Sequence, residues 1–268
     1  MFYNAKNHKI KIDQSDIDYI SFGIGNKNLI IIPGLGDGLR TVKGMAIPLA
    51  LMYIQFAKEY TVYVFSRRNN LTNGFTTQDM AQDIVEIMKL LNISKAYIMG
   101  VSQGGMIAQC IAIMSPERVS KLVLAVTSSK TNEMINNVVG NWIKLAERED
   151  FKNIFIDTAE KSYSEKYLEK YRRYYNILWR FCKPKDYERF IIQANSCLSH
   201  NVYDDLYKIK CPTLIIGGQQ DSIVGVNSSK EIADKVSNSE LYLYEDYGHA
   251  VYEEAKDFNE RVLKYLKR

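Results

Sequence analysis

One short segment, Gly100-Val101-Ser102-Gln103-Gly104, constrains the fold of this chain more than any other part of its sequence. A short apolar run of strand type, Lys95–Met99, precedes it, and the apolar residues Met106–Met114 after it predict a helix that Ser115-Pro116 would end. The pattern predicts a sharp strand-to-helix turn with a serine at its apex. Such a turn is strained, so the neighbours of the serine must be small, and the two glycines satisfy that demand.

A serine in this position predicts acyl transfer through a covalent serine ester. The five-residue pattern also occurs by chance in ordinary loops, where the serine has no chemical role. The strand before the motif and the helix after it favour the catalytic interpretation of Ser102.

Strand-like and helix-like segments alternate along most of the chain. The predicted strands are continuous apolar runs, which are typical of a parallel sheet covered on both faces. They are 29–32, 61–65, 95–99, 121–126, 213–217 and 241–244, and the predicted helices include 49–58, 76–91 and 254–267. The pattern therefore predicts an α/β fold with a mostly parallel central sheet flanked by helices.

The alternation stops after Ser128. Residues 131–205 are polar, aromatic and helix-like, and they contain both tryptophans, Trp142 and Trp179. We expect residues 1–130 and 206–268 to form one core domain and 131–205 to form a helical cap or lid. Two interpretations of this insertion stay open: a lid that lines the substrate site, or a packed helical layer without a ligand role.

A serine nucleophile needs a general base, which is usually histidine. The chain contains three candidates: His8, His200 and His249. Functional groups in parallel α/β sheets gather beyond the carboxyl ends of the strands. His249 directly follows the last strand-like run, so we expect it to be the base.

The base in turn needs an acid that orients it. Asp221 follows the strand-like run 213–217, and the order Ser102, Asp221, His249 is the order found with this type of turn. The competing acids are Asp204 and Asp205 at the end of the insertion, and Glu245 and Asp246 beside the histidine. The last two lie too close to His249 in sequence to reach behind its ring.

An oxyanion intermediate needs two backbone N–H donors. We expect one from Gln103, the residue after the nucleophile, and the other from Leu35 in the glycine-rich loop 33–38. The alternative for this loop is a phosphate cradle, but its glycine spacing fits neither common phosphate-binding motif. We also expect Asp37 to repel a phosphate.

Charge, cysteine usage and hydropathy limit the partners. The net charge of +4 is small and spread out, so neither nucleic acid nor an anionic membrane surface is expected. The first residues contain no apolar signal segment, and the longest apolar stretch, Met45–Ile54, is too short to span a bilayer and predicts a buried helix. Cys110, Cys182, Cys197 and Cys211 lack metal-binding spacing. We expect a cytoplasmic monomer or homodimer with reduced cysteines, no cofactor and a small-molecule acyl substrate.

Taken together, these motifs resemble the α/β-hydrolase fold family, and within it the small cofactor-free esterases and lactonases. The resemblance covers nearly the whole chain. The segments that carry it, in order, are Val64–Arg68, Ile98–Gly105, Ser115–Val119, Cys211–Ile216 with Asp221, and Gly248-His249. Two departures stand out: Pro33-Gly34 replaces the usual His-Gly, and Val64–Arg68 lacks the Asp and Gly of the usual Asp-x-Arg-Gly.

The resemblance and the candidate residues together predict a serine hydrolase for a carboxylic ester, thioester or lactone. A serine nucleophile argues against the dehalogenase and epoxide hydrolase chemistry that this fold also supports with aspartate. The same residues would also serve perhydrolysis, carbon–carbon bond hydrolysis or acyl transfer. A non-catalytic small-molecule receptor is a further alternative, because the fold alone does not define the reaction.

Overall fold

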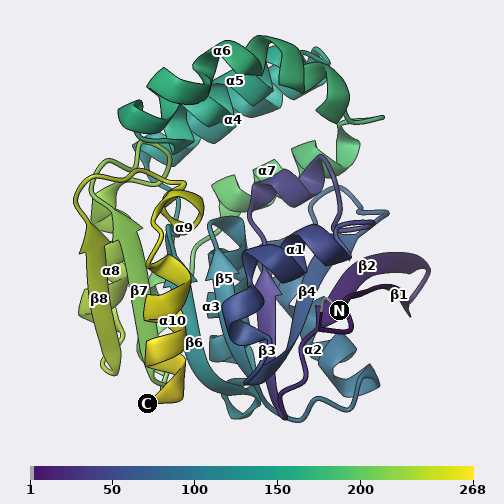
Figure 1. Ribbon diagram of the computed structural model, residues 1–268, viewed down its shortest axis with the longest axis vertical. Helices are drawn as coiled ribbons and strands as arrows, with labels where there is room; N and C mark the ends of the chain where they lie inside the picture. The colour runs from purple at the N-terminus through teal and green to yellow at the C-terminus, as the bar shows by residue number, and fades with distance from the viewer. Residues whose placement is uncertain (1–2) are drawn as a thin grey trace.

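A computed structural model describes residues 3–268. An eight-stranded sheet runs through this part of the chain in the order β1-β2-β4-β3-β5-β6-β7-β8 (Figure 1). Strands β3 to β8 are mutually parallel, whereas β2 is antiparallel to both β1 and β4. The strands are β1 (Lys6–Ile12), β2 (Ser15–Phe22), β3 (Lys27–Ile32), β4 (Tyr60–Arg68), β5 (Ala96–Val101), β6 (Val119–Ala125), β7 (Thr213–Gly218) and β8 (Ser239–Tyr244). The predicted α/β fold with a mostly parallel sheet is confirmed.

Helices cover both faces of this sheet. The α-helices are α1 (Ala46–Met52), α2 (Thr77–Leu90), α3 (Gln103–Met114), α4 (Glu133–Glu147), α5 (Phe151–Ser162), α6 (Glu165–Cys182), α7 (Glu188–Ser199), α8 (Val226–Lys235), α9 (Val251–Glu254) and α10 (Phe258–Lys267). Short 3-10 helices are η1 (Leu35–Gly38), η2 (Ile54–Phe56), η3 (Pro116–Arg118) and η4 (Tyr203–Lys208).

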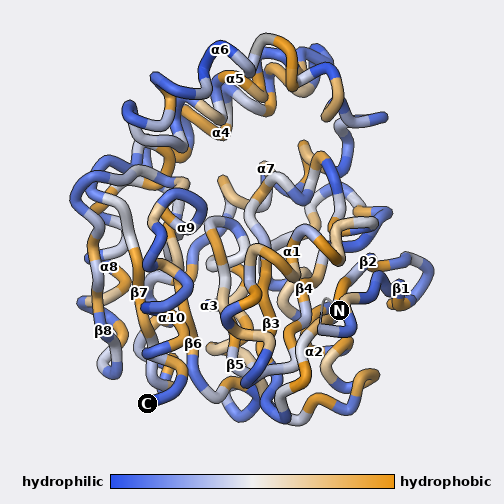
Figure 2. Tube along the Cα trace, viewed as in Figure 1, coloured by the Kyte–Doolittle hydropathy of each residue, from blue (hydrophilic) through white to orange (hydrophobic). Residues whose placement is uncertain are grey.

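The alternation of side chains along each strand explains why the predicted strands are apolar throughout. In β3, Ile30 and Ile32 join the core beneath α2, α3 and α8, while Leu29 and Ile31 join the core beneath α1 and α10. Successive residues of a strand point to opposite faces, so a strand covered on both sides must be continuously apolar. Figure 2 shows the result: the central strands are mainly hydrophobic, whereas the outlying α6 is hydrophilic over much of its length.

Some elements differ from the sequence-based expectations. The hairpin of β1 and β2 and the helix α8 were not anticipated. The helix expected over 49–58 is replaced by α1 and the short η2. The apolar stretch Met45–Ile54, expected as a buried helix, is only partly buried, because Ile47 and Leu51 are about half exposed. The helix expected over 254–267 begins later, as α10 at Phe258, because the chain leaves helical geometry at Ala255 after the short α9.

Four helices, α4 to α7, connect β6 to β7 and lie over one end of the sheet (Figure 1). The chain enters and leaves this helical insertion at the same place. The amide of Thr131 donates to the carbonyl of His200 at 3.1 Å, and the amide of Val202 donates to the carbonyl of Ser129 at 2.8 Å. The two connecting segments therefore pair side by side at the point where the insertion joins the sheet.

Candidate active site

Ser102 occupies the turn between β5 and α3 with φ 54° and ψ −121°. A positive φ is unfavourable for a residue with a side chain, so close packing must hold this turn in place. A Cβ atom on Gly104 would lie 2.0 Å from the carbonyl oxygen of Ile32, and one on Gly100 would lie 2.3 Å from the carbonyl oxygen of Gly104. Both small residues expected beside the serine are thus required by the packing of α3 against the sheet.

The structure brings the three predicted residues Ser102, His249 and Asp221 together. Nε2 of His249 lies 3.0 Å from Oγ of Ser102, and Nδ1 lies 2.8 Å from Oδ2 of Asp221. Each residue follows the carboxyl end of a parallel strand: β5, β8 and β7 respectively. The sheet therefore positions the nucleophile, base and acid candidates in one hydrogen-bonded line.

The carboxylate of Asp221 is buried and held from two sides. Its Oδ1 accepts hydrogen bonds from the amides of Ile223 and Val224, at 2.9 and 3.0 Å. Burial disfavours the charged carboxylate, but the nearby His249 and these hydrogen bonds outweigh it and lower the pKa of Asp221 below its ordinary value. Asp221 is therefore suited to remain ionised beside the imidazole.

The other candidates lie elsewhere. His8 contacts Ser21 in the N-terminal hairpin. His200 is buried with Nδ1 2.8 Å from Oγ1 of Thr77, and burial lowers its pKa to about 4. Glu245 and Asp246 are exposed, as expected for solvated loop residues.

The two predicted oxyanion donors each begin a helix that starts close to Ser102. Leu35 is the first residue of η1 and Gln103 is the first residue of α3. Amides in the first turn of a helix have no acceptor within that helix, so both N–H groups are available to a ligand. A Cβ on Gly34 would lie 3.3 Å from Cβ of Ser102, which shows how closely the loop backbone approaches the serine.

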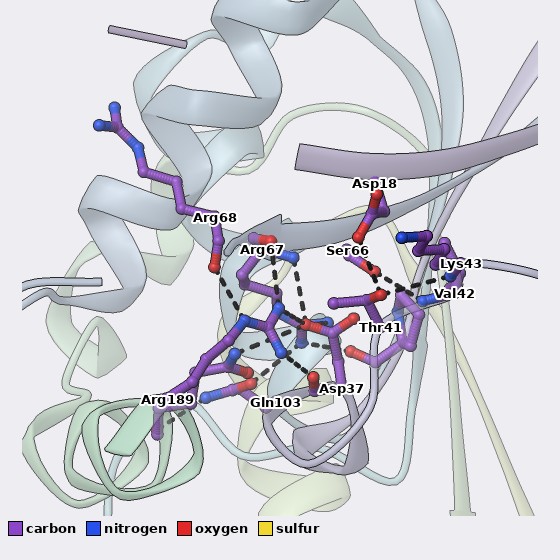
Figure 3. Close-up of polar contacts among 12 residues, drawn as sticks. Asp18, Asp37, Thr41, Val42, Lys43, Ser66, Arg67, Arg68, Gln103 and Arg189 are labelled. Carbon is purple, nitrogen blue, oxygen red and sulfur yellow. Dashed lines mark hydrogen bonds and ion pairs between the residues drawn. The ribbon is translucent and has the colours of Figure 1, made fainter. Parts of the chain in front are cut away.

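A buried charge cluster behind this loop was missed by the sequence analysis (Figure 3). The carboxylate of Asp37 pairs with Arg189 from α7 and lies 3.8 Å from Nη1 of Arg67, at the end of β4. Both cations lower the pKa of Asp37, although its burial acts in the opposite direction. Two guanidinium groups thus surround the carboxylate of Asp37 and offset its negative charge.

A cavity of about 340 Å³ opens onto Ser102, His249, Leu35 and Gln103. Its apolar walls come from the core and from the helical insertion. They include Leu49, Met52, Val101, Met106, Ile135, Val139, Trp142 and Ile223. Among the described residues, no lysine or arginine lines this cavity, whereas Asp37 and Glu253 do. The space next to the serine is thus mainly apolar, with acidic rather than basic side chains at its edge.

Two further observations concern metals and membranes. Within residues 3–268, no group of three or more His, Cys, Asp or Glu side chains could hold a metal ion. None of the helices in the described part of the chain is long and apolar enough to cross a membrane. Cys110 is buried in the core as expected, and burial raises the pKa of its thiol to about 11.

The family profile described as alpha/beta hydrolase fold matches residues 27–256, and the chain belongs to this family. A putative carbamate hydrolase, RutD, of Rhizobium rhizogenes is 25% identical over 263 residues, covering 90% of this chain and 93% of the relative. A 2-hydroxy-6-oxononadienedioate/2-hydroxy-6-oxononatrienedioate hydrolase of Burkholderia vietnamiensis is 26% identical over 277 residues, covering 94% and 91%. The crystal structure of the enol-lactonase from Burkholderia xenovorans matches with a TM-score of 0.83 at 17% identity, covering 97% of this chain and 100% of that one. The expected fold family is confirmed, and the named relatives are hydrolases of differing substrates.

Proposed function

We propose that this protein is a serine hydrolase that cleaves a small carboxylic ester, thioester or lactone through Ser102, His249 and Asp221. The observation that carries the proposal is the continuous line of contacts from Asp221 through His249 to Ser102, 2.8 and 3.0 Å in length. Hydrogen-bond distances of this size allow direct proton transfer between nucleophile and base.

The mechanism follows from these contacts. His249 takes the proton of Ser102 at Nε2 as Oγ attacks the substrate carbonyl, and Asp221 accepts from Nδ1–H and stabilises the imidazolium. The amides of Leu35 and Gln103 donate to the oxyanion. His249 then protonates the leaving group and activates the water that cleaves the acyl-enzyme, which returns Ser102 to its free form.

The cavity supports an uncharged substrate. Its volume of about 340 Å³ lies at the small end of the range of roughly 300–1,000 Å³ for small-molecule sites. No lysine or arginine of the described chain lines it, and Glu253 adds a carboxyl group at its edge. A dicarboxylate such as the one in the name of the Burkholderia vietnamiensis relative would meet no cationic side chain here. We therefore favour a neutral ester or lactone over a dianionic substrate for carbon–carbon bond cleavage.

We further propose that residues 131–205 act as a cap over the site. Ile135, Val139 and Trp142 of α4 line the cavity beside Ser102. The carbonyl of Ser162, at the end of α5, also accepts a hydrogen bond of 2.8 Å from the amide of Ala250, next to His249. The insertion would thus set the shape of the substrate site.

Labelling with a fluorophosphonate probe tests the proposal, because such probes react with activated serines. Wild-type protein and Ser120→Ala should be labelled, whereas Ser102→Ala and His249→Ala should not. Ser120 is a matched control on β6, outside the cavity. A panel of p-nitrophenyl esters, lactones and a vinylogous 1,5-diketone, with and without added peroxide or alcohol, then distinguishes hydrolysis from the related reactions. Absence of labelling in the wild type would overturn the catalytic role and leave a binding protein.

A further inference from the structure

One buried side chain, Arg67, contacts both segments that carry the proposed oxyanion donors (Figure 3). Its Nη2 donates to the carbonyl oxygen of Pro33, two residues before Leu35, and to Oε1 of Gln103 at 3.0 Å. Arg67 itself belongs to β4, so a third element of the fold joins these two. One guanidinium group therefore links the two donor segments, in addition to the direct packing of Gly104 against Ile32 and Pro33.

The side chain of Gln103 is fixed at its other end as well. Its Nε2 donates to the carbonyl of Gln193 at 2.7 Å and to Oγ of Ser196 at 3.2 Å, both on α7. These bonds turn the Oε1 atom of Gln103 toward Arg67. The first turn of α3, which begins with the cavity-lining Gln103, is thereby held between α7 and β4.

The charge cluster contains more positive charge than is needed to neutralise Asp37. Arg189 donates to both the carboxylate and the carbonyl of Asp37, which already gives a balanced pair. Arg67 adds a second cation whose side chain is 2% exposed. Among the described residues, its Nε and Nη1 have no hydrogen-bond acceptor.

Burying a surplus charge is unfavourable. Burial lowers the pKa of Arg67 to about 10, even though Asp37 acts to raise it. Asp37 and Arg189 would remain a neutral pair without Arg67, so pairing within the cluster does not account for the second arginine. Its contacts to Pro33 and Gln103 do account for it.

We propose that Arg67 is the positioning residue of the oxyanion hole, holding the amides of Leu35 and Gln103 at one spacing while placing a surplus positive charge behind them. This inference rests on the proposed hydrolase function. Negative charge develops on the substrate oxygen only as the tetrahedral intermediate forms. Arg67 therefore stabilises the transition state more than it stabilises the bound substrate. A loss of Arg67 should therefore lower kcat and leave KM nearly unchanged.

The experiment compares Arg67→Met with Arg68→Met. Arg68 is the adjacent residue and also forms ion pairs, at 2.6 Å with the buried Asp83 and at 2.9 Å with the exposed Asp13, but its side chain does not contact the oxyanion segments. A displacement of about 1 Å in a catalytic donor costs about 100-fold in rate. We expect Arg67→Met to lose about 100-fold in kcat with KM within about 3-fold of wild type, and Arg68→Met to keep the wild-type kcat.

A boronic acid inhibitor supplies a second measurement, because it forms a tetrahedral adduct with the serine. Its Ki should rise for Arg67→Met by the factor by which kcat/KM falls, and should not change for Arg68→Met. Arg67→Lys, which keeps the charge but loses the planar fork, should fall between wild type and Arg67→Met. This variant also provides the test if Arg67→Met does not fold.

The outcomes separate this inference from the proposed function. Wild-type protein that does not react with the fluorophosphonate overturns the hydrolase and the inference with it. A wild type that is labelled, together with an Arg67→Met or Arg67→Lys variant that keeps the wild-type kcat and boronate Ki, overturns only the role of Arg67. Equal losses of kcat in Arg67→Met and Arg68→Met would show a general structural role and would also overturn it.

Discussion

Nδ1 of His249 lies 2.8 Å from Oδ2 of Asp221, whose other oxygen is already occupied by two backbone amides. The acid therefore cannot rotate to another partner without losing the hydrogen bonds from Ile223 and Val224. Asp221 presents one oxygen, in one orientation, to the imidazole. A substitution of Asp221 therefore tests directly whether the orientation of His249 matters for the reaction.

Asp221→Asn should retain the fold and lose about 10⁴-fold in kcat, because an amide at this position favours the wrong tautomer of His249. Steady-state kinetics on the best ester from the panel measure the loss. Asp246→Asn is the matched control, since Asp246 is exposed and lies three residues before the histidine. A variant at Asp221 that keeps more than about a tenth of wild-type kcat would contradict its role as the orienting acid.

The buried His200 should make the protein sensitive to mild acid. Its pKa is about 4 in the folded protein against an ordinary value of 6.5, so the unfolded chain binds the extra proton between these values. The contribution of His200 to the free energy of unfolding is then fully present above about pH 6.5 and decreases as the pH drops toward 4. We expect the free energy of unfolding to be about 2 kcal/mol lower at pH 5 than at pH 7 from this group alone.

Urea unfolding of wild type and His200→Gln at the two pH values checks this expectation. Glutamine retains a group that can hydrogen-bond Thr77 and has no proton to gain, so the variant should lose less stability in acid. An equal loss in the two proteins would assign the acid sensitivity to other groups.

Gly104→Ala should destabilise the protein by about 3 kcal/mol or more, because the new methyl group would lie 2.0 Å from the carbonyl oxygen of Ile32. Gly140→Ala is the matched control within α4, where a Cβ meets no atom within 4 Å. That change should raise stability by up to about 1 kcal/mol through helix propensity. Thermal melts of both variants measure the contrast, and similar melting temperatures would refute the steric account of the turn.

Val139→Phe should narrow the acyl preference of the enzyme. Val139 reaches the cavity from α4, and a larger side chain there takes space from the substrate. We expect kcat/KM to fall about tenfold or more for a long-chain p-nitrophenyl ester and to change little for the acetate. The acetate is the internal control, and an unchanged chain-length profile would mean that α4 does not bound the acyl site.

Much of the sheet was predictable because its strands are buried on both faces. Runs such as 29–32 and 122–125 contain no polar interruption, and the structure places them in β3 and β6. The arrangement of Ser102, Asp221 and His249 was predictable for a related reason. Parallel strands bring their carboxyl ends to one edge of the sheet, so residues that directly follow different strands lie close together.

The N-terminal hairpin was missed because its outer strand, β1, is largely exposed and polar. The alternation of Lys9, Ile10, Lys11 and Ile12 was the available signal, but it is short and lies in a charged segment. The charge cluster was missed for a different reason. Asp37 pairs with residues 30 and 152 positions away, and no local periodicity reports such contacts.

The paired segments at Ser129–Thr131 and His200–Val202 give the molecule a modular construction. Two main-chain hydrogen bonds close the connection before the first inserted helix begins and after the last one ends. For the sheet, the connection from β6 to β7 is therefore closed at this junction, and its length beyond the junction adds little entropic cost. A different helical insertion could be grafted between these two paired segments while the sheet keeps its fold. The substrate specificity would then change without a change of the core.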